Sequence, residues 1–287
     1  MQYASLIENR KSVRAFQNRA ISREDMEALR SYYEKDCQRL VGEIPTELVI
    51  LQGEEAKDLE GAAGYEQKLP GAPYYLVLLT GKHEKAGMNA GFMMEDLILK
   101  LEDMDLSACW ITFTDSEKVK KALKLSNPLE IGAIAAFGLG EKRQKKMRLN
   151  ILSMSCVDVI AQRGYYAPKK DIRELAFVNE IDNIVGLDEK IGFYDDMLWQ
   201  ALYSCTKAPS YLNRQPYAFL LKDQNVILVK MPDPYTDQDS FQLDLGIVML
   251  HFSAIAQQWM GKITWDLDPH MDLNLPQGAE AAAVYRM

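Results

Sequence analysis

Cysteine and histidine are scarce in this chain, and neither is arranged for metal or dithiol chemistry. The four cysteines, at positions 37, 109, 156 and 205, are too far apart for a CxxC pair. The three histidines cannot form a histidine cage around a metal ion unless carboxylates supply most of the ligands. Widely spaced cysteines suit a reducing compartment, where free thiols fill core positions. We therefore expect a cytoplasmic protein without a bound metal.

Long apolar runs and an excess of positive charge are absent as well. No apolar run reaches the roughly 18 to 20 residues of a membrane span, and the first residues carry charges where a signal peptide needs an apolar stretch. Asp and Glu (41) outnumber Lys and Arg (33), so the net charge is −8 and no global positive field attracts nucleic acid. We expect neither a membrane nor a nucleic acid as partner.

What remains is an ordinary globular composition. The 287 residues are 48% hydrophobic and 26% charged, and no low-complexity segment or linker rich in Pro and Ser interrupts them. A chain of this length can bury a sizeable core without disulfides or metals. We expect one body over 1–287.

Hydrophobic periodicity predicts helices alternating with strands. Helices are predicted over 3–9, 22–40, 85–104, 187–205 and 241–259. Strands are predicted over 47–51, 74–80, 109–113, 131–139 and 263–267, with a hairpin of 218–222 and 226–230 whose turn is 223–225. The helix at 241–259 is almost wholly apolar, so other elements must cover it on all sides. The pattern predicts an α+β protein.

The two halves of the chain share a weak internal repeat. A shift of 155 residues aligns three identical pairs without a gap: Gly91 with Gly246, Met94 with Met249, and Trp110 with Trp265. Each window is a buried helix that leads into a Trp-bearing strand. Three identities could also arise by chance. The physical interpretation is two copies of one α+β unit, approximately 1–165 and 175–287, folded on each other.

The first segment with chemical potential is basic. Arg10, Lys11, Ser12 and Arg14 follow the short helix at 3–9. Guanidinium groups bind phosphate oxygens bidentately, and a serine hydroxyl can add a further hydrogen bond. A solvated face of charged residues is the alternative.

The second segment is a polar loop between a helix and a strand. Pro209 and Pro216 fix its backbone, while Ser210, Asn213 and Gln215 offer uncharged hydroxyl and amide groups. Such a loop suits the donors and acceptors at the edge of a heteroaromatic ring. A well-capped turn without a ligand is an equal alternative.

The third set consists of Gly138, Gly140 and the pair Lys169–Lys170. The glycines follow a predicted strand, but the third glycine and the acidic partner of a dinucleotide-binding fingerprint are missing. The lysines can be either anion ligands or an ordinary exposed charge run.

Other constellations are disfavoured. No G-x-S-x-G motif is present, and Cys205 has no histidine near it in sequence, which argues against a nucleophilic hydrolase. Glu95 and Asp96 are adjacent on a helix and point in different directions, so they do not form a catalytic pair. His251, inside the apolar helix, is expected to be a hydrogen-bonded core histidine.

Together these segments resemble the nitroreductase family of FMN-dependent oxidoreductases. The stretch R-K-S-V-R-A-F from Arg10 to Phe16 looks like the family's phosphate motif R-x-S-x-R-x-F. The stretch from Pro209 to Tyr217 looks like its P-S-x-x-N-x-Q-P-W loop, with Tyr217 in place of the usual Trp. The stretches 71–110, 138–140 and 169–175 match more loosely, so the resemblance touches most of the chain.

The chain departs from the common family pattern in one respect. In ordinary members one subunit gives the Arg/Ser cluster and its partner gives the Ser/Asn loop, so a dimer has two identical sites. Here 41–46 reads V-G-E-I-P-T at the equivalent place in the first half, and the second half has no R-x-S-x-R. The chain is similar to the divergent branch labelled "putative TM nitroreductase", although its composition contradicts a membrane span. The resemblance implies a nitroreductase-like fold fused into a single-chain pseudo-dimer, monomeric, with one FMN.

The resemblance also implies which residues bind the cofactor. We expect the phosphate at the Arg/Ser cluster and Lys169 or Lys170, and the ribityl chain or pyrimidine edge at the polar loop. The expected cofactor-binding residues are Arg10, Lys11, Ser12, Arg14, Gly138, Gly140, Lys169, Lys170, Pro209, Ser210, Asn213 and Gln215. Tyr217 is expected either to cap or to open the flavin face.

The implied activity is hydride transfer. NADH or NADPH would reduce the flavin at N5, and an electron-poor small molecule of the nitro, quinone or enone type would reoxidise it. The sequence offers no side chain for a general acid or base. Two alternatives remain open: a protein of the same fold that binds FMN or another ligand without turnover, and a flavin-dependent dehydrogenase or dehalogenase of a specific metabolite.

Overall fold

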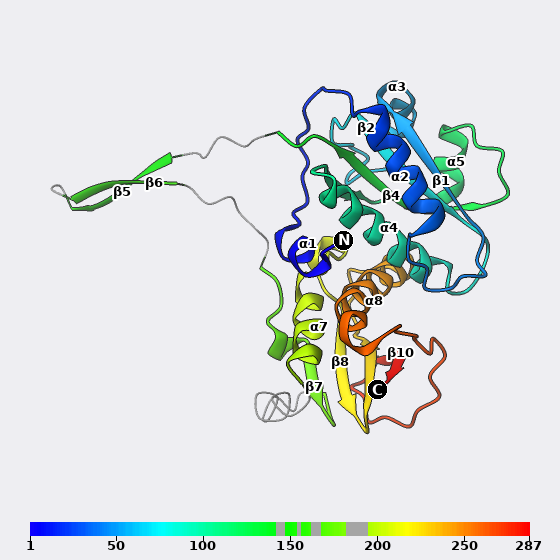
Figure 1. Ribbon diagram of the computed structural model, residues 1–287, viewed down its shortest axis with the longest axis vertical. Helices are drawn as coiled ribbons and strands as arrows, with labels where there is room; N and C mark the ends of the chain where they lie inside the picture. Colours follow the sequence, from blue (N-terminus) through cyan, green and yellow to red (C-terminus); the bar gives the residue numbers. More distant parts are fainter. Residues whose placement is uncertain (142–146, 154–155, 162–167, 182–194) are drawn as a thin grey trace.

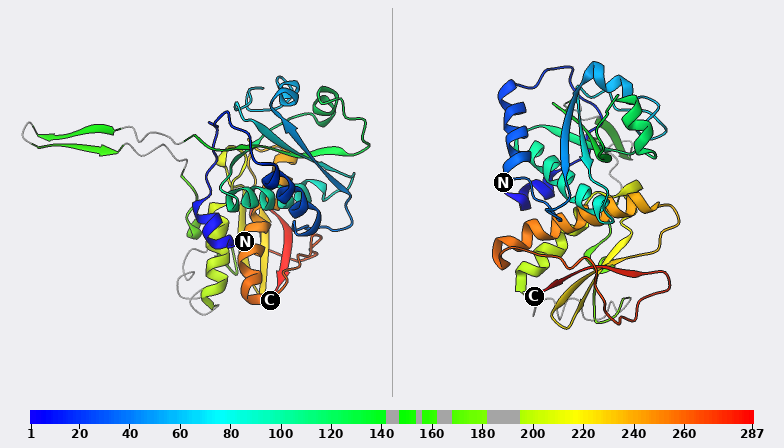
Figure 2. Two further views of the ribbon diagram at one scale, coloured as in Figure 1. Left: turned by 45° about the horizontal axis from the view of Figure 1, so that its top comes forward. Right: turned by 90° about the vertical axis from the view of Figure 1, so that its right-hand side faces the viewer.

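Two four-stranded sheets enclose a layer of helices in the computed structural model, which describes residues 1–141, 147–153, 156–161, 168–181 and 195–287 (Figure 1). The first sheet forms from the N-terminal half and the second from the C-terminal half. Figure 2 shows the two long helices α4 and α8 between the sheets. This arrangement confirms the predicted α+β class.

The first sheet has the strand order β1-β2-β4-β3, and every neighbouring pair is antiparallel. The strands are β1 (Thr46–Gln52), β2 (Tyr74–Thr80), β4 (Glu130–Gly138) and β3 (Ser107–Ile111). All seven residues of β2 are buried, because one face of the sheet packs on α4 and the other on a second apolar cluster. A strand covered on both faces needs no polar alternation.

The second sheet has the order β10-β9-β8-β7. Its strands are β10 (Glu280–Arg286), β9 (Asn225–Lys230), β8 (Tyr217–Lys222) and β7 (Ala176–Val178), of which β7 runs parallel to β8. Asp223 and Gln224 form the turn of the β8–β9 hairpin with φ angles of 50° and 58°. Two left-handed residues match the twist of paired strands, as in type I′ turns.

The helices α4 (Ala86–Asp103) and α8 (Gln238–Met260) form the centre of the molecule. Both are buried over most of their length, because each packs on its own sheet and on the other helix. A Cβ atom at Gly91 would collide with the carbonyl oxygen of Leu243, and one at Gly246 with that of Met88. The two glycines therefore allow the backbones to touch.

This crossing is reciprocal. Gly91 contacts Leu243, and Gly246 contacts Met88. The repeat of 155 residues relates Gly91 to Gly246 and Met88 to Leu243. In a two-fold interface residue i meets j and j meets i, which is the pattern seen here. The sheets agree with it in part. Asp266 bridges to Val284 of β10 as β3 pairs with β4, whereas β7 is a parallel edge strand and the first sheet is antiparallel throughout.

Smaller elements cover the outside. The helices are α1 (Tyr3–Asn9), α2 (Arg23–Lys35), α3 (Gly53–Ala56), α5 (Ser116–Ala122) and α7 (Asp195–Lys207), with 3₁₀ turns η1 (Lys57–Leu59), η2 (Ile172–Glu174) and η3 (Tyr211–Asn213). A separate hairpin of β5 (Met147–Ser153) and β6 (Cys156–Ala161) stands away from the body (Figure 1).

Several predicted elements need correction. The helix that starts after Ser22 ends at Lys35, so Cys37 and Leu40 lie beyond it. No strand covers 263–267, where only Asp266 makes a single bridge, and the third strand lies at Ser107–Ile111, two residues earlier than predicted. The start of the helix predicted over 187–205 falls outside the described residues, and its described part is α7. Helix α1, strand β2 and the β8–β9 hairpin are confirmed.

Two exclusions hold for the part of the chain that the structure describes. No helix there has the length and apolar character needed to cross a membrane. Among the same residues, no group of three or more His, Cys, Asp or Glu side chains could hold a metal ion.

Candidate functional site

The basic segment that follows α1 lies along the edge of the first sheet. Ser12 forms a parallel bridge to Ala108 of β3, and the N–H of Val13 donates to the carbonyl oxygen of Ala108 at 3.0 Å. Val13 packs on the outer apolar cluster of that sheet, whereas Ser12 and Arg14 are exposed. The backbone pairing thus presents the hydroxyl and one guanidinium group to solvent.

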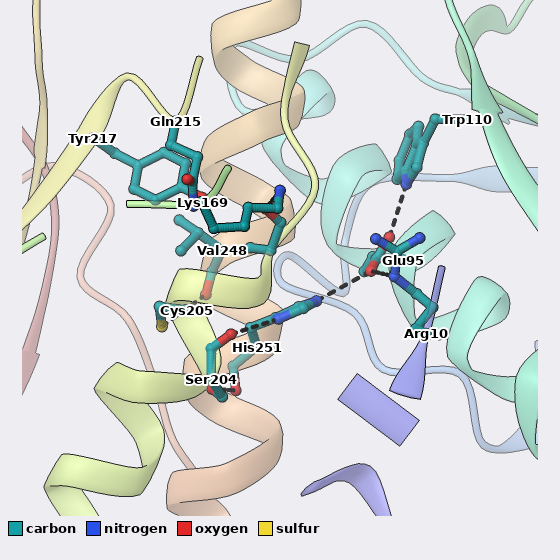
Figure 3. Close-up of polar contacts among 11 residues, drawn as sticks. Arg10, Glu95, Trp110, Lys169, Ser204, Cys205, Gln215, Tyr217, Val248 and His251 are labelled. Carbon is teal, nitrogen blue, oxygen red and sulfur yellow. Dashed lines mark hydrogen bonds and ion pairs between the residues drawn. The ribbon is translucent and has the colours of Figure 1, made fainter. Parts of the chain in front are cut away.

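Arg10 points into the protein. Its Nε lies 3.3 Å from Oε1 of Glu95 on α4, and its side chain is only 6% exposed. Trp110 donates to the other carboxylate oxygen at 2.8 Å, and Nε2 of His251 on α8 lies 3.1 Å from Oε1 (Figure 3). Glu95 therefore connects the N-terminal segment, the first sheet and the central helix of the second half.

The charge state of Glu95 follows from these neighbours. Burial raises the pKa of this carboxyl, but Arg10 and then His251 and Trp110 outweigh burial and hold it below its ordinary value. The ion pair leaves one donor unused, because Nη1 of Arg10 is buried and has no hydrogen-bond partner. A buried unpaired donor costs about 1–3 kcal/mol, more when it is charged, which an anionic ligand would remove.

Lys169 brings a second cation to Arg10. Its Nζ donates to the carbonyl oxygen of Ala208 at 2.8 Å, at the start of the polar loop. Burial, and after it the positive charge of Arg10, lower the pKa of Lys169 to about 8. The two residues are far apart in sequence, so the fold has brought the basic segment next to the 208–216 loop.

That loop is fastened by its own polar side chains. The N–H of Gln215 donates to Oγ of Ser210 at 2.9 Å, and Nε2 of Gln215 donates to the carbonyl oxygen of Thr206 at 3.0 Å. Oε1 of Gln215 accepts from the N–H of Lys170 at 2.8 Å. Gln215 is 1% exposed, so its amide holds the loop in shape and is fully used within the protein.

The backbone of the loop is strained. Leu212, Asn213 and Gln215 have φ angles of 48°, 57° and 47°, in the left-handed region that costs a non-glycine residue about 1–2 kcal/mol. The N–H of Tyr211 donates to both carboxylate oxygens of Asp244, at 2.9 and 3.1 Å, which anchors the loop on α8. Strain of this kind, held by surrounding contacts, is typical of functional loops.

The remaining predicted residues of the loop region differ in their contacts. Asn213 is half-buried and donates from Nδ2 to the carbonyl oxygen of Pro168 at 2.7 Å, while Pro209 is also half-buried. Nζ of Lys170 donates to the carbonyl oxygen of Gln215 at 2.7 Å, and burial lowers its pKa. Tyr217 is fully buried beneath the loop, so it lies in the core instead of at an open face.

Gly138 and Gly140 have packing reasons for lacking a side chain. A Cβ at Gly138 would meet Cγ of Pro73 at 2.7 Å, and one at Gly140 would meet Oγ of Ser107 at 2.6 Å. Both glycines lie where β4 ends beside the basic segment, since Phe16 bridges to Gly140. Lys11 lies in the basic segment and is exposed.

The structure therefore brings together Arg10, Lys169 and the 208–216 loop, while Ser12 and Arg14 line the adjoining sheet edge. His251 is confirmed as a hydrogen-bonded core histidine. Sequence reasoning missed the roles of Glu95 and Asp244. Their signal was available, because a carboxylate within an almost wholly apolar helix is buried only when donors compensate it.

Comparison with known proteins gives one family. Residues 3–256 match the model of the family described as "Putative TM nitroreductase". The structure is similar to that of a "putative nitroreductase" from Thermotoga maritima MSB8, with a TM-score of 0.59 and 15% identity over 99% of this chain and 93% of that chain. At this identity the likeness shows the fold alone.

Two shorter structures match about half of this chain. A nitroreductase family protein from Clostridium novyi NT has 20% identity and a TM-score of 0.44 over 51% of this chain and 89% of its own. An FMN-dependent nitroreductase from Clostridium difficile R20291 has 14% identity and a TM-score of 0.41 over 48% and 88%. No curated protein matches the chain.

Proposed function

The chain belongs to the family described as "Putative TM nitroreductase", and on that premise we propose that it is an FMN-dependent oxidoreductase. Its electron donor is NADH or NADPH, and its acceptor is an electron-poor small molecule of the nitro, quinone or enone type. The observation that carries the proposal is the buried, unpartnered Nη1 of Arg10 beside Lys169 and the 208–216 loop.

The residues present fit a phosphate-bearing cofactor. Arg10 offers a charged donor without a partner, and Lys169 adds a second positive charge. Ser12 and Arg14 are exposed on the adjoining edge and supply a hydroxyl and a free-standing guanidinium group of the kind that binds phosphate oxygens. The loop is already held by Asp244 and Gln215, which lowers the cost of ordering it around a ligand.

FMN, when bound, supplies hydride acceptance and release at its N5. The chain supplies binding and electrostatics. Cations near the ring and the phosphate stabilise negative charge there, and Lys169 contributes its charge below about pH 8, where its pKa lies. Asn213 and the backbone of the loop are the groups from the second half that we assign to the ribityl chain and ring edge.

We further propose that the two halves correspond to the two subunits of a family dimer. The support is the reciprocal crossing of α4 and α8, the position of Asp266 beside β10 as β3 lies beside β4, and the equivalence of Asn89 and Asp244. These two residues are also 155 positions apart, and each accepts N–H groups from the loop beside it: Asn89 from Leu40 and Val41, Asp244 from Tyr211.

One cofactor per chain follows from this proposal. The first-half loop beside Asn89 carries no serine, asparagine or glutamine in 41–46. The complete set of donors exists once, where the basic segment meets the 208–216 loop. No second copy of the chain is needed to complete that site, and we expect a monomer in the cytoplasm.

The test begins with the visible spectrum of purified protein reconstituted with FMN. We expect one FMN per chain, and Arg14→Ala should weaken FMN binding more than tenfold, the scale of a lost charge-assisted hydrogen bond of about 1.5–3 kcal/mol. Arg286→Ala, which removes an exposed arginine on β10, is the matched control and should leave binding unchanged.

Steady-state oxidation of NADH and NADPH with a quinone or a nitroarene then tests turnover. Flavin-bound protein that oxidises neither nucleotide would leave a binding protein of the same fold and overturn the enzymatic proposal. Protein that stays colourless after FMN addition would overturn the cofactor assignment.

A further inference from the structure

His251 faces two oxygen atoms that act as acceptors. Its Nδ1 lies 3.0 Å from the carbonyl oxygen of Ser204, and its Nε2 lies 3.1 Å from Oε1 of Glu95 (Figure 3). A carbonyl oxygen has no proton to donate, so Nδ1 carries one. A bare Nε2 facing an ionised carboxylate oxygen would set lone pair against lone pair. A second proton therefore lies between Nε2 of His251 and Oε1 of Glu95.

This proton decides the local charge balance. Whichever of the two atoms carries it, the His251–Glu95 pair is neutral as a unit. The charge of Arg10, whose Nε contacts the same Oε1, is then uncompensated, and its Nη1 has no partner. Loss of the proton would leave the pair with one negative charge, which would neutralise Arg10 in a region shielded from water.

Glu102 on α4 interacts with both Arg10 and Lys11, so its one charge is shared between two cations. Burial raises the pKa of Asp96 on the same helix. Asp96 on α4 accepts from Tyr3, Tyr32 and the N–H of Gln38.

On the side of the second half, Asp244 of α8 accepts from the N–H of Tyr211, and burial raises its pKa well above the ordinary value. Burial raises the pKa of Cys205 on α7 and that of Tyr217 on β8 well above their ordinary values, so both are neutral. Lys169 from the 168–170 segment adds positive charge.

We propose that His251 is a positioning residue whose proton, shared with Glu95, keeps the charge of Arg10 available for an anionic ligand. On the proposed function, which this inference deepens, the ligand is the phosphate group of the flavin. A free oxyanion such as sulfate offers the same negatively charged oxygen atoms, and the experiment below distinguishes it from the flavin phosphate. Binding and this proton are linked, so each favours the other. Affinity for the anion falls as pH rises and the proton leaves.

Two substitutions fix the pair in opposite states. His251→Gln keeps a donor toward Glu95 but brings no second proton, so Glu95 neutralises Arg10 at every pH. Glu95→Gln keeps an acceptor for Arg10 but carries no charge, so Arg10 stays uncompensated at every pH. Both are made in a Lys169→Arg background, which holds the charge at position 169 constant. The probes are FMN and sulfate, since the charge of sulfate does not change over this range.

Binding is measured by titration between pH 6 and pH 9, with thermal unfolding and near-ultraviolet circular dichroism as controls for folding. We expect His251→Gln to bind FMN about tenfold more weakly at pH 6 with little pH dependence. Glu95→Gln should bind as tightly at pH 9 as the parent does at pH 6. A purely structural role predicts weakening in both variants, and that result would overturn the proposal.

The unmodified protein gives a second test that survives misfolding of either variant. Its other histidines, His83 and His270, are exposed, so histidine ¹⁵N resonances separate the buried ring from the rest. We expect proton-bearing Nδ1 and a shared proton at Nε2, lost at a higher pH once FMN or sulfate is added. An Nε2 resonance that changes neither with pH over this range nor on addition of sulfate or FMN would overturn the proposal. If sulfate shifts the signal and FMN does not bind, only the flavin assignment fails.

Discussion

The central helices α4 and α8 occupy equivalent places in the two halves but carry different polar residues. Asn89 on α4 and Asp244 on α8 both anchor a loop through backbone N–H groups. Asp96 and His251, again 155 positions apart, differ more: Asp96 accepts from two tyrosine hydroxyls, whereas Nε2 of His251 lies 3.1 Å from Oε1 of Glu95. The halves share the packing that defines the fold, and they differ in the charges that surround the loops.

The two sides of the molecule differ in how their buried charged groups are compensated. On the first-half side, Tyr3, Tyr32 and the N–H of Gln38 satisfy the buried carboxylate of Asp96. Beside the strained loop of the second half, Nη1 of Arg10 has no hydrogen-bond partner and Lys169 lies close enough to Arg10 for the two charges to interact. On the proposed function, the first set of contacts stabilises the fold and the second binds the ligand, so only the second loop needs the polar motif.

The shared packing should be the most sensitive to change. Gly246→Ala places a methyl group against the carbonyl oxygen of Met88, and Gly91→Ala does the same against Leu243. We expect each to lower the free energy of unfolding by about 2 to 3 kcal/mol, despite the better helix propensity of alanine. Urea denaturation measures the loss. Gly42→Ala, with nothing within 4 Å of the added Cβ, is the control, and a clearly unequal loss at the two glycines would contradict a reciprocal crossing.

The loop anchors come next. Asn89→Ala and Asp244→Ala each leave half-buried N–H groups without an acceptor, so we expect a loss of about 1 to 3 kcal/mol in both. Asp244→Asn copies the first-half residue and should retain most of the stability, because its Oδ1 can still accept from Tyr211. Urea unfolding midpoints of the three variants test this. If Asp244→Asn were as damaging as Asp244→Ala, the two anchors would not be equivalent.

Lys169 should make binding depend on pH. Its pKa in the folded protein, about 8, lies below its ordinary value because of burial and Arg10. The ammonium is charged below pH 8 and neutral above it, so sulfate should bind up to about tenfold more weakly at pH 9.5 than at pH 7.5. Arg at this position stays charged, and Lys169→Arg should abolish the part of the decline above pH 8. An unchanged profile would remove Lys169 from the site.

The lowered pKa of Lys169 also makes the free energy of unfolding depend on pH. Between about pH 8 and the ordinary lysine pKa, the unfolded chain binds more protons at this residue than the folded chain. The contribution of Lys169 to stability therefore rises with pH in that window and is unfavourable below it. A neutral Lys169→Met variant should unfold at a higher urea concentration than the wild type at pH 7, with the gain lost at higher pH.

Exposed ion pairs should matter least in either half. Arg23–Glu27 on α2 and Arg286–Asp266 beside β10 both have well-exposed arginines. Arg23→Ala and Arg286→Ala should change the free energy of unfolding by less than about 0.5 kcal/mol. Thermal unfolding in low and high salt checks this, and a larger loss in one half alone would show that its surface charges are coupled to the core.

Local pattern was enough to predict the elements whose partners are near in sequence. The β8–β9 hairpin and helix α1 follow from alternation, turn residues and short-range spacing. Strand β10 escaped prediction because its alanine-rich sequence carries little strand signal, and its pairing with β9 is set by the register of distant residues. The predicted strand at 263–267 makes only one bridge. Its pairing also depends on β10, which is its only neighbour among the described strands.

The candidate site shows the same limit. The residue types of Arg10 and Gln215 suggested binding, but the direction in which each points depends on partners far away in the chain. Glu95 turns Arg10 inward, and Thr206 and Lys170 occupy the amide of Gln215. Motif spacing identifies the segments that meet, while distances between them come only from the folded chain.

The mutual burial of α4 and α8 has a consequence for biosynthesis. About 135 residues separate the end of α4 at Asp103 from the start of α8 at Gln238. At about 5 to 20 residues per second, a nascent chain waits roughly 7 to 27 s before the second helix arrives to cover the first. During that interval the nascent chain exposes the apolar surface of α4 that α8 later covers. Premature termination anywhere in this stretch should yield aggregates, and a holding chaperone should raise the yield of full-length protein.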